Sequence, residues 1–267
     1  MAGPAQRGQV ERHALATDAG GANTGEAPAL QYLLSPSSCL LPPSRRRYND
    51  LNMQPLTETD YEHISLGELE PEVARTVMGA CISPRPIALI STLGPGGIVN
   101  AAPFSNFMGV ATEPPLIAFG IGPRNGEEKD TLRNVRENGH FVINCVSVEI
   151  AEAMHHTAAD YPRNRSEVEA AGFTTLPGTD QPVPRIAEAP IHMECRVHKI
   201  VELGGPKPDH AIVVGEVLRV HVRRDCMGVG TIPNALGWNP LGGIGDDYML
   251  PGKTFSLEYP SPKDTNY

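Results

Sequence analysis

Residues 86–104 read P-I-A-L-I-S-T-L-G-P-G-G-I-V-N-A-A-P-F and decide the fold. Two runs rich in apolar and β-branched side chains, 86–92 and 98–104, flank the turn sequence G-P-G-G at 94–97. Glycine reaches positive φ without a steric cost, and residues that do so join paired strands through tight connections. The stretch therefore predicts two antiparallel strands joined as a β-hairpin.

The segments that follow the hairpin continue the β pattern, with short helices between the strands. Residues 115–122 and 141–146 are apolar runs of strand length. Apolar residues at i, i+3 spacing predict a short helix over 131–138, and Gly139 is expected to end it. A second short helix is expected over 149–156.

Two later segments predict a pair of longer strands. Apolar and polar residues alternate over 191–198, which is the period of a half-buried strand with one core face and one exposed polar face. The predicted polar face carries His192, Glu194, Arg196 and His198. The β-branched run 210–222 predicts an antiparallel neighbour, on which His221 is also expected to be exposed. Six or more strands with only short helices indicate a mainly β domain, as a barrel or a sandwich.

Composition and charge narrow the class of protein. The chain has 267 residues, and its 27 glycines and 26 prolines favour short elements joined by turns. A net charge of −9 argues against a nucleic-acid partner, and no apolar run is long enough to predict a membrane span. The five cysteines are scattered without C-x-x-C spacing, so we predict neither disulfides nor a zinc site, and a cytoplasmic location fits best.

Two parts of the chain differ in composition. Residues 1–52 are rich in Ala, Gly, Pro and Ser and lack periodicity, so we predict a disordered N-terminal extension. A transit peptide is the alternative, although acidic residues spread through the segment argue against it. Residues 53–267 are predicted to form the folded domain.

The sequence G-E-E-K-D-T at 126–131 opens the first predicted helix. A helix N-terminus offers unpaired N–H groups and a partial positive charge, so Lys129 and Thr131 could hold a phosphate there. In the alternative interpretation, Asp130 caps the helix and Lys129 is a solvated surface charge. The motif alone leaves both interpretations open.

Two further stretches carry candidate ligand-binding residues. The small and polar residues at 100–106, N-A-A-P-F-S-N, would expose backbone N–H and C=O groups to a flat heteroaromatic ring, or would only end a strand. At 83–86, S-P-R-P, two prolines stiffen the chain and would direct Arg85 to a phosphate or carboxylate, or leave it as a surface arginine.

Motifs of several other chemistries do not occur in the sequence. It has no G-x-G-x-x-G in a strand-to-helix setting, no G-x-x-x-x-G-K-[ST], no G-x-S-x-G and no H-E-x-x-H. His155 and His156 are adjacent on a predicted helix, where successive side chains project about 100° apart, so we predict no metal site. No catalytic side chain is predicted.

Taken in order, seven stretches resemble the flavin reductase-like domain family, with flavoredoxin-type members most similar. They are I-S-P-R-P-I-A-L-I-S-T (82–92), N-A-A-P-F-S-N-F (100–107), E-P-P-L-I-A-F (113–119), K-D-T-L-R-N-V (129–135), F-V-I-N (141–144), A-E-A-P-I-H-M-E-C (187–195) and V-V-G-E-V (213–217). The resemblance covers about residues 70–260, and so many matches in one order make it specific.

The resemblance implies an FMN-binding split β-barrel that works as a homodimer, with the flavin near the subunit interface. The implied contacts to the ribityl phosphate come from Arg85, Ser105, Lys129, Thr131 and Arg124. The implied contacts to the isoalloxazine ring come from Thr92 and from the backbone of Asn100, Ala101 and Ala102. His210 would lie near the nicotinamide or the ring. In the closing segment at 240–248, relatives often have Arg or His where Gly243 stands.

The function that the resemblance implies is an FMN-dependent NAD(P)H oxidoreductase that reduces flavin and supplies it to a partner oxygenase. Hydride transfer takes place between the two cofactors, so a dedicated catalytic side chain is not needed. One alternative is a flavoredoxin-type electron-transfer protein that accepts electrons from a protein partner. Another is a non-redox module that binds a different cofactor. The choice between NADH and NADPH stays open because the sequence lacks a dinucleotide fingerprint.

Overall fold

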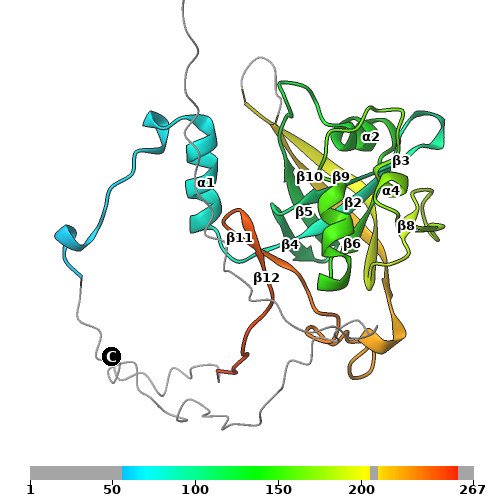
Figure 1. Cartoon of the computed structure of the whole chain (residues 1–267). Coiled ribbons are helices and arrows are strands. Elements are labelled where there is room, and N and C mark those ends of the chain that lie inside the picture. Colours follow the sequence, from blue (N-terminus) through cyan, green and yellow to red (C-terminus); the bar gives the residue numbers. More distant parts are fainter. Residues whose placement is uncertain (1–55, 205–209, 258–267) are drawn as a thin grey trace, which may run out of the picture. The chain divides into compact units, whose positions relative to one another are not determined.

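The computed structural model describes residues 56–204 and 210–257 (Figure 1). Its main feature is an antiparallel sheet of seven strands in the order β3-β2-β6-β9-β10-β5-β4. These strands are β2 (Ala88–Leu93), β3 (Val99–Phe104), β4 (Phe107–Thr112), β5 (Pro115–Ile121), β6 (His140–Cys145), β9 (Ile191–Leu203) and β10 (His210–Val222). The predicted mainly β class with short helices is confirmed.

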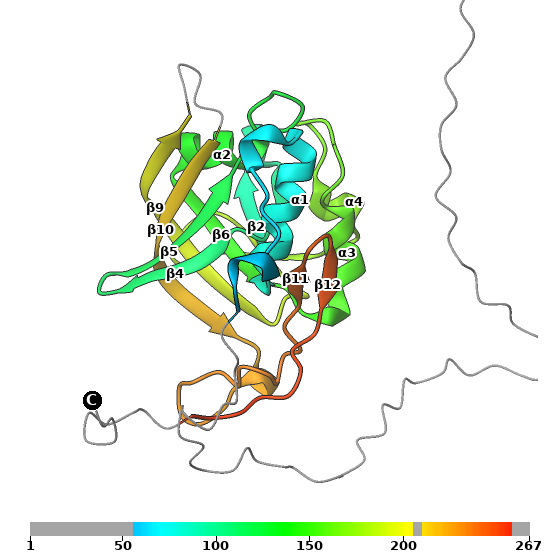
Figure 2. The same cartoon turned by 90° about the vertical axis from the view of Figure 1, so that its left-hand side faces the viewer.

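The sheet curls until strands that are not neighbours in it share one core (Figure 2). The ring centroids of Phe104 on β3 and Phe119 on β5 lie 5.2 Å apart, although four strands separate β3 from β5 in the sheet. Phe119 also packs against Phe141 of β6, with 5.4 Å between the ring centroids. A sheet that closes on itself in this way is a barrel, as predicted.

The predicted hairpin at 86–104 is confirmed. β2 and β3 pair in antiparallel register, with Ser91 opposite Ala101. The connecting turn contains Gly96 and Gly97 at φ values of 68° and 82°, which residues with a Cβ atom avoid. β3 is an edge strand of the large sheet, so its outer side is open to pairing with other parts of the chain.

Two predicted helices are present. α2 (Asp130–Asn138) ends at Gly139, which adopts the left-handed conformation at φ 69° as predicted. α3 (Ala151–His156) begins later than predicted because Val148–Ile150 form a 3₁₀ turn. The sequence patterns did not predict the short helix α4 (Glu167–Ala170).

The exposed polar face predicted for residues 191–198 is wrong at two of its four positions. His192 is only 6% exposed, and Glu194 is fully buried. Arg196 and His198 are exposed as predicted. The polar face of β9 is therefore covered at one end and open further along the strand.

The cover is residues 177–186, whose path the sequence patterns did not predict. Glu194 accepts hydrogen bonds of 2.8 Å from the backbone N–H groups of both Thr179 and Asp180. Nε2 of His221, on the neighbouring β10, lies 2.7 Å from Oε1 of Glu194, so His221 is only partly exposed. A buried carboxylate is tolerated here because these donors replace its lost hydration.

A second sheet of three short strands was not predicted. Its strands are β1 (Arg85–Pro86), β11 (Gly242–Ile244) and β12 (Asp247–Met249), in the order β1-β11-β12. The helix α1 (Pro71–Cys81) is also new, and the guanidinium of Arg85 donates to the carbonyl of Gly79 on this helix. Arg85 thereby links α1 to the small sheet, in which it stands directly opposite Gly243.

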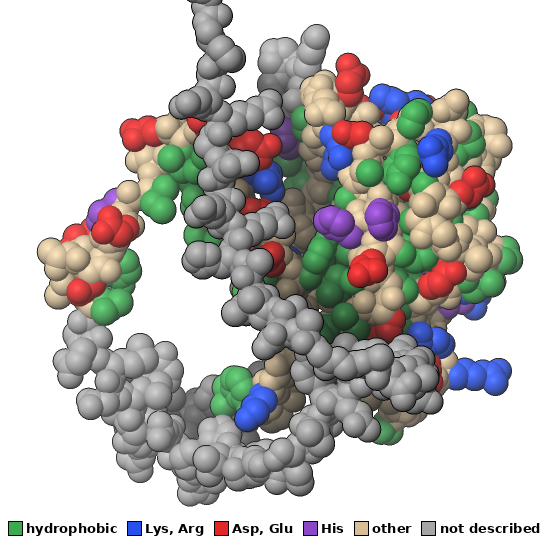
Figure 3. Space-filling view, in the orientation of Figure 1, with side chains coloured by type: hydrophobic (Ala, Val, Ile, Leu, Met, Phe, Trp, Pro, Cys, Tyr) green, Lys and Arg blue, Asp and Glu red, His purple; other side chains and the backbone are tan. Residues whose placement is uncertain are grey.

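The remaining described elements are short. They are β7 (Thr175–Leu176), β8 (Arg185–Ile186) and 3₁₀ turns at Glu58–Asp60, Leu66–Glu68, Pro95–Gly97 and Arg224–Cys226. Within the described ranges, no helix has the length and apolar character needed to cross a membrane. Basic and acidic side chains are interspersed on the face shown in Figure 3. The predicted N-terminal extension, 1–52, lies outside the described residues.

Candidate functional site

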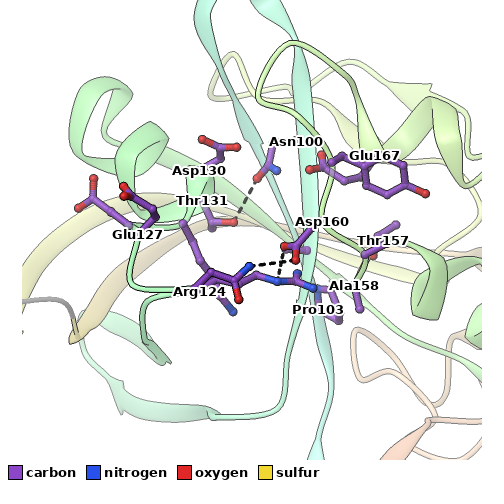
Figure 4. Close-up of a pocket in the computed structure, with 16 residues that line it drawn as sticks. Asn100, Pro103, Arg124, Glu127, Asp130, Thr131, Thr157, Ala158, Asp160 and Glu167 are labelled. Carbon is purple, nitrogen blue, oxygen red and sulfur yellow. Dashed lines mark hydrogen bonds and ion pairs between the residues drawn. The ribbon is translucent and has the colours of Figure 1, made fainter. Parts of the chain in front are cut away.

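A pocket of about 370 Å³ lies where β3 meets the start of α2 (Figure 4). Its walls come from β3, from the loop that leads into α2, and from residues near α3 and α4. The lining residues are Asn100, Ala102, Pro103, Arg124, Asn125, Glu127, Glu128, Lys129, Asp130, Thr131, Thr157, Ala158, Ala159, Asp160, Tyr161 and Glu167. We call this space the β3–α2 pocket.

An Asn-Gly turn brings the start of α2 to this pocket. Arg124 and Glu127 exchange two backbone hydrogen bonds of 2.9 Å, and the two residues between them both have positive φ, 52° at Asn125 and 79° at Gly126. Two-residue turns of this kind favour Asn-Gly. The turn reverses the chain so that Lys129, at the N-cap of α2, lines the pocket.

The first turn of α2 supplies groups that suit an anion. The N–H groups of Asp130 and Thr131 open the helix and so have no intrahelical acceptor. The helix dipole adds a partial positive charge at the same end. The ammonium of Lys129 lies 5.4 Å from the ring centroid of Phe104, a cation–π contact that holds it near β3.

Acidic side chains outnumber basic ones in the pocket wall, but arginines neutralise most of them. Asp160 pairs with Arg124, Asp130 is closest to Arg133 (3.1 Å), and Glu128 is closest to Arg136 (2.9 Å). Among the described residues, Lys129 forms no ion pair with a carboxylate. Burial lowers the pKa of Lys129, the charge of Arg124 lowers it further, and Asp160 opposes both. An anionic ligand would stabilise the charged form of this ammonium and so compensate for the hydration that it loses on burial.

A buried hydrogen-bond network stands behind the pocket wall. The hydroxyls of Thr92 and Thr131 each donate to Oδ1 of Asn100 at 3.1 Å, and Nδ2 of Asn134 donates to the Thr92 hydroxyl at 3.0 Å. All four side chains are at most 8% exposed. The Thr131 hydroxyl proton is therefore directed at Asn100, which leaves the backbone N–H of Thr131, without an acceptor inside the helix, as the remaining donor of this residue.

Glu167 completes the pocket and was missed by the sequence analysis. It is 7% exposed, and its Oε2 accepts a hydrogen bond of 3.2 Å from the N–H of Ala101. The neighbouring Ser166 donates its hydroxyl to the carbonyl of Val99 at 2.6 Å, so α4 satisfies the outer edge of β3. Burial raises the pKa of Glu167. Since glutamates are rarely buried, no local sequence signal marks this one.

Arg85 and Ser105 are not in the β3–α2 pocket. They line a second pocket of about 210 Å³, beside the small sheet and α1. Pro103 lines both pockets, so the two adjoin along β3. We call the second space the Arg85 pocket.

The ten predicted site residues thus fall into three groups. Five line the β3–α2 pocket: Asn100, Ala102, Arg124, Lys129 and Thr131. Two line the Arg85 pocket: Arg85 and Ser105. Three line neither: Thr92 and Ala101, which are fully buried, and His210, which is exposed at the start of β10. Within the described ranges, no group of His, Cys, Asp or Glu side chains is arranged to hold a metal ion.

Comparison with known proteins agrees with this fold and this arrangement of motifs. A family profile described as "Flavin reductase like domain" matches residues 78–231. An uncharacterised protein of Halalkalibacterium halodurans is 37% identical over 191 residues, which cover 70% of this chain and 90% of that protein.

Two solved structures show a similar fold. Nitrilotriacetate monooxygenase component B from Bacillus cereus has a TM-score of 0.70 and 32% identity, over 74% of this chain and 98% of that one. A split barrel domain protein from Shewanella frigidimarina has a TM-score of 0.66 and 24% identity, over 75% of this chain and 100% of that one. The split barrel that the resemblance implied is therefore confirmed. The family profile covers more than half of the sequence, and the chain belongs to the flavin reductase-like domain family.

Proposed function

We propose that this protein is an FMN-binding oxidoreductase that uses NAD(P)H to reduce flavin. The observation that carries the proposal is the β3–α2 pocket, in which Lys129 and the first turn of α2 lie across from Asn100 and Ala102 of β3. Membership of the flavin reductase-like family supports a flavin as the ligand of that pocket.

The residues present fit the phosphate of FMN. Lys129 is a half-buried cation with no carboxylate of its own among the described residues, and the N–H groups of Asp130 and Thr131 open toward the pocket end of the helix. Helix N-termini with these features bind phosphate groups. We assign the phosphate to this end of the pocket, with Arg124 as a weaker contributor because it is already paired with Asp160.

The residues on β3 fit the flat ring system. Ala102 and Pro103 present small apolar side chains, so a planar ligand can approach the strand closely. Asn100 is held in one orientation by the hydroxyls of Thr92 and Thr131. Thr92 and Thr131 therefore act as positioning residues, and the contacts to the ring are assigned to Asn100 and Ala102.

FMN, when bound, supplies the hydride-accepting chemistry. The work left to the chain is to hold the phosphate, orient the ring and limit water around it. Lys129 and the N-terminus of α2 would hold the phosphate, and the fixed side chain of Asn100 would orient the ring. This division of roles requires no catalytic side chain.

We also propose a partner oxygenase, a homodimer and a cytoplasmic location. A structural relative is by name a component of a monooxygenase, which supports delivery of reduced flavin to an oxygenase.

The proposed homodimer is supported by the edge strand β4. This strand exposes Met108 (59%) and Val110 (49%), and an apolar edge strand suits pairing with a second copy of the chain.

An anaerobic titration of the FMN-reconstituted protein with NADH, and then with NADPH, tests this function. We expect the absorption band of oxidised flavin to disappear rapidly with one of the two donors. A bound flavin that resists both donors but is reduced by a protein partner would instead support the flavoredoxin-type alternative. Failure to bind any flavin would favour the non-redox binding module.

A further inference from the structure

An ion pair joins two segments that line the β3–α2 pocket. Arg124, in the loop that leads into α2, pairs with Asp160, in the segment between α3 and α4, and a dashed line marks the contact in Figure 4. Both side chains line the pocket. The side-chain amide of Asn125 also donates to the Asp160 carboxylate, at 3.3 Å. Asp160 therefore connects the two segments at the pocket wall.

Asp160 differs from the other paired carboxylates of the pocket in the cation that it uses. Asp130 and Glu128 lie closest to arginines of α2 that do not line the pocket. Asp160 pairs instead with Arg124, which is one of the two cations in the wall. Asp160 thus disfavours an anionic ligand in two ways, because it adds a negative charge to the wall and engages a cation that the ligand needs.

Both members of this ion pair lie close enough to Lys129 to affect its protonation. Burial lowers the pKa of Lys129, the charge of Arg124 lowers it further, and the charge of Asp160 raises it. All three side chains line the same pocket. A phosphate held by Lys129 would therefore be attracted by Arg124 and repelled by Asp160.

The contact between Arg124 and Asp160 is weak enough for a ligand to replace. The two side chains are 42% and 59% exposed, so water and salt screen their attraction. An exposed ion pair changes an equilibrium constant by about fivefold at most. A charge-assisted contact between an arginine and a phosphate changes it by about tenfold or more. A phosphate can therefore take Arg124 from Asp160.

A change of partner requires only a rotation of the Arg124 side chain. The backbone of Arg124 is held by the Asn-Gly turn, in which it exchanges two hydrogen bonds of 2.9 Å with Glu127. Asp160 contacts Nε, one of the two N–H groups on the side edge of the guanidinium. A phosphate binds an arginine best through two parallel N–H groups, so Asp160 occupies an edge that the phosphate would use.

From these contacts we propose that Asp160 competes with the phosphate of the ligand for Arg124 and so weakens binding at the β3–α2 pocket. The inference rests on the proposed function and adds a regulation of the same site. Arg124 leaves Asp160 when a phosphate binds and returns to it when the phosphate departs. A flavin that is delivered to an oxygenase has to leave the pocket, and an internal competitor favours its release.

Asp160→Asn tests the proposal, because it removes the charge and keeps the size of the side chain. We expect FMN to bind this variant about three- to tenfold more tightly than the wild type, with no gain for riboflavin, which lacks the phosphate. Quenching of flavin fluorescence measures both dissociation constants for the full chain. Unchanged or weaker binding of FMN, or an equal gain for riboflavin, would overturn the proposal.

A second variant shows whether the gain depends on Arg124. In a chain that already carries Arg124→Gln, the added change Asp160→Asn should tighten FMN binding by about twofold at most, because only charge repulsion is then removed. An equal gain with and without Arg124 would contradict a competition for this side chain.

Asp180→Asn is the matched control. Asp180 forms an exposed ion pair with Arg219 at 2.7 Å and lines neither pocket. Its replacement removes the same charge from the chain and should leave FMN affinity within about twofold of the wild type. A gain in Asp180→Asn equal to that in Asp160→Asn would assign the effect to net charge and overturn the proposal.

Inorganic phosphate separates a failure of this inference from a failure of the proposed function. If neither the wild type nor Asp160→Asn binds a flavin, the proposed function fails, and phosphorus NMR with inorganic phosphate decides the inference. Phosphate should then bind Asp160→Asn at least about threefold more tightly than the wild type. Equal affinities, or no binding of phosphate to either protein, would overturn the inference as well.

Discussion

The hydroxyl of Thr131 donates a hydrogen bond of 3.1 Å to Oδ1 of Asn100, which joins the first turn of α2 to the strand β3. Both residues line the β3–α2 pocket, and both are buried, with 1% and 8% of their surface exposed. Oδ1 of Asn100 also accepts from Thr92, so its two lone pairs are both used. The side chain of Asn100 is thereby fixed in one orientation at the pocket wall.

Thr131→Val should lower the free energy of unfolding by about 1–2 kcal/mol, because it removes a buried donor and keeps the shape of the side chain. FMN affinity should fall less than it does in a lysine variant, because the hydroxyl positions Asn100 instead of holding the phosphate. Urea unfolding and an FMN titration measure the two quantities. Thr175→Val, at an exposed position, is the control for stability. A large loss of FMN at unchanged stability would mean that the hydroxyl itself contacts the ligand.

Lys129→Ala should weaken FMN binding by about tenfold to a hundredfold, since one charge-assisted contact to a phosphate contributes about 1.5–3 kcal/mol. Quenching of flavin fluorescence gives the dissociation constant. Lys199→Ala removes the same charge from an exposed position on β9 and should have little effect. An unchanged affinity in Lys129→Ala would place the phosphate elsewhere.

Glu167→Gln should make the protein more stable at neutral pH and leave its stability nearly unchanged in acid. Because burial raises the pKa of Glu167 above 4.5, its favourable contribution is complete below pH 4.5 and is lost as the pH rises through the raised pKa. Glutamine can still accept the N–H of Ala101 and never ionises. Denaturation at pH 4 and pH 7 measures the difference, with the exposed Glu169→Gln as control. A variant less stable than wild type at pH 7 would contradict this account.

His192 should make the fold sensitive to acid. Burial lowers its pKa from 6.5 to about 4, and its Nε2 lies 2.8 Å from the carbonyl of Ile186, which fits a neutral ring that donates one hydrogen bond. Its contribution to stability is complete above pH 6.5 and is lost as the pH falls to about 4, about 3 kcal/mol in all.

His192→Gln should therefore flatten the dependence of unfolding free energy on pH between 6.5 and 4. Glutamine retains a donor for Ile186 but takes up no proton in this range. His198→Gln changes an exposed residue of the same strand and should leave the slope as in wild type. Equal slopes in all three proteins would show that His192 is not protonated on unfolding.

The elements that could be predicted from the sequence are those whose formation depends on residues close together in the chain. The hairpin at 86–104 depends on apolar runs and on glycines that adopt positive φ, and the end of α2 depends on Gly139. The small sheet has no such local signal, because strands of two or three residues exist only through partners far along the chain. Arg85 pairs with Gly243 in this way.

The same distinction holds for the site. Lys129 is recognisable in the sequence because it stands at a helix start, and the Asn-Gly pair at 125–126 is a further local signal, of the turn that precedes this helix. Glu167 and Glu194 were missed or misplaced because their burial depends on segments that fold over them. Sequence order alone also could not tell that Arg85 and Lys129 line different pockets.

We propose that the N-terminus of α2, with Lys129, holds the phosphate of FMN. Riboflavin has the same ring system without the phosphate, so the dissociation constants of FMN and riboflavin for the full chain measure what the phosphate contributes. We predict that FMN binds at least about tenfold more tightly than riboflavin in the wild type and that Lys129→Ala loses most of this preference. Equal affinities for FMN and riboflavin in the wild type, or an undiminished preference in Lys129→Ala, would contradict the account.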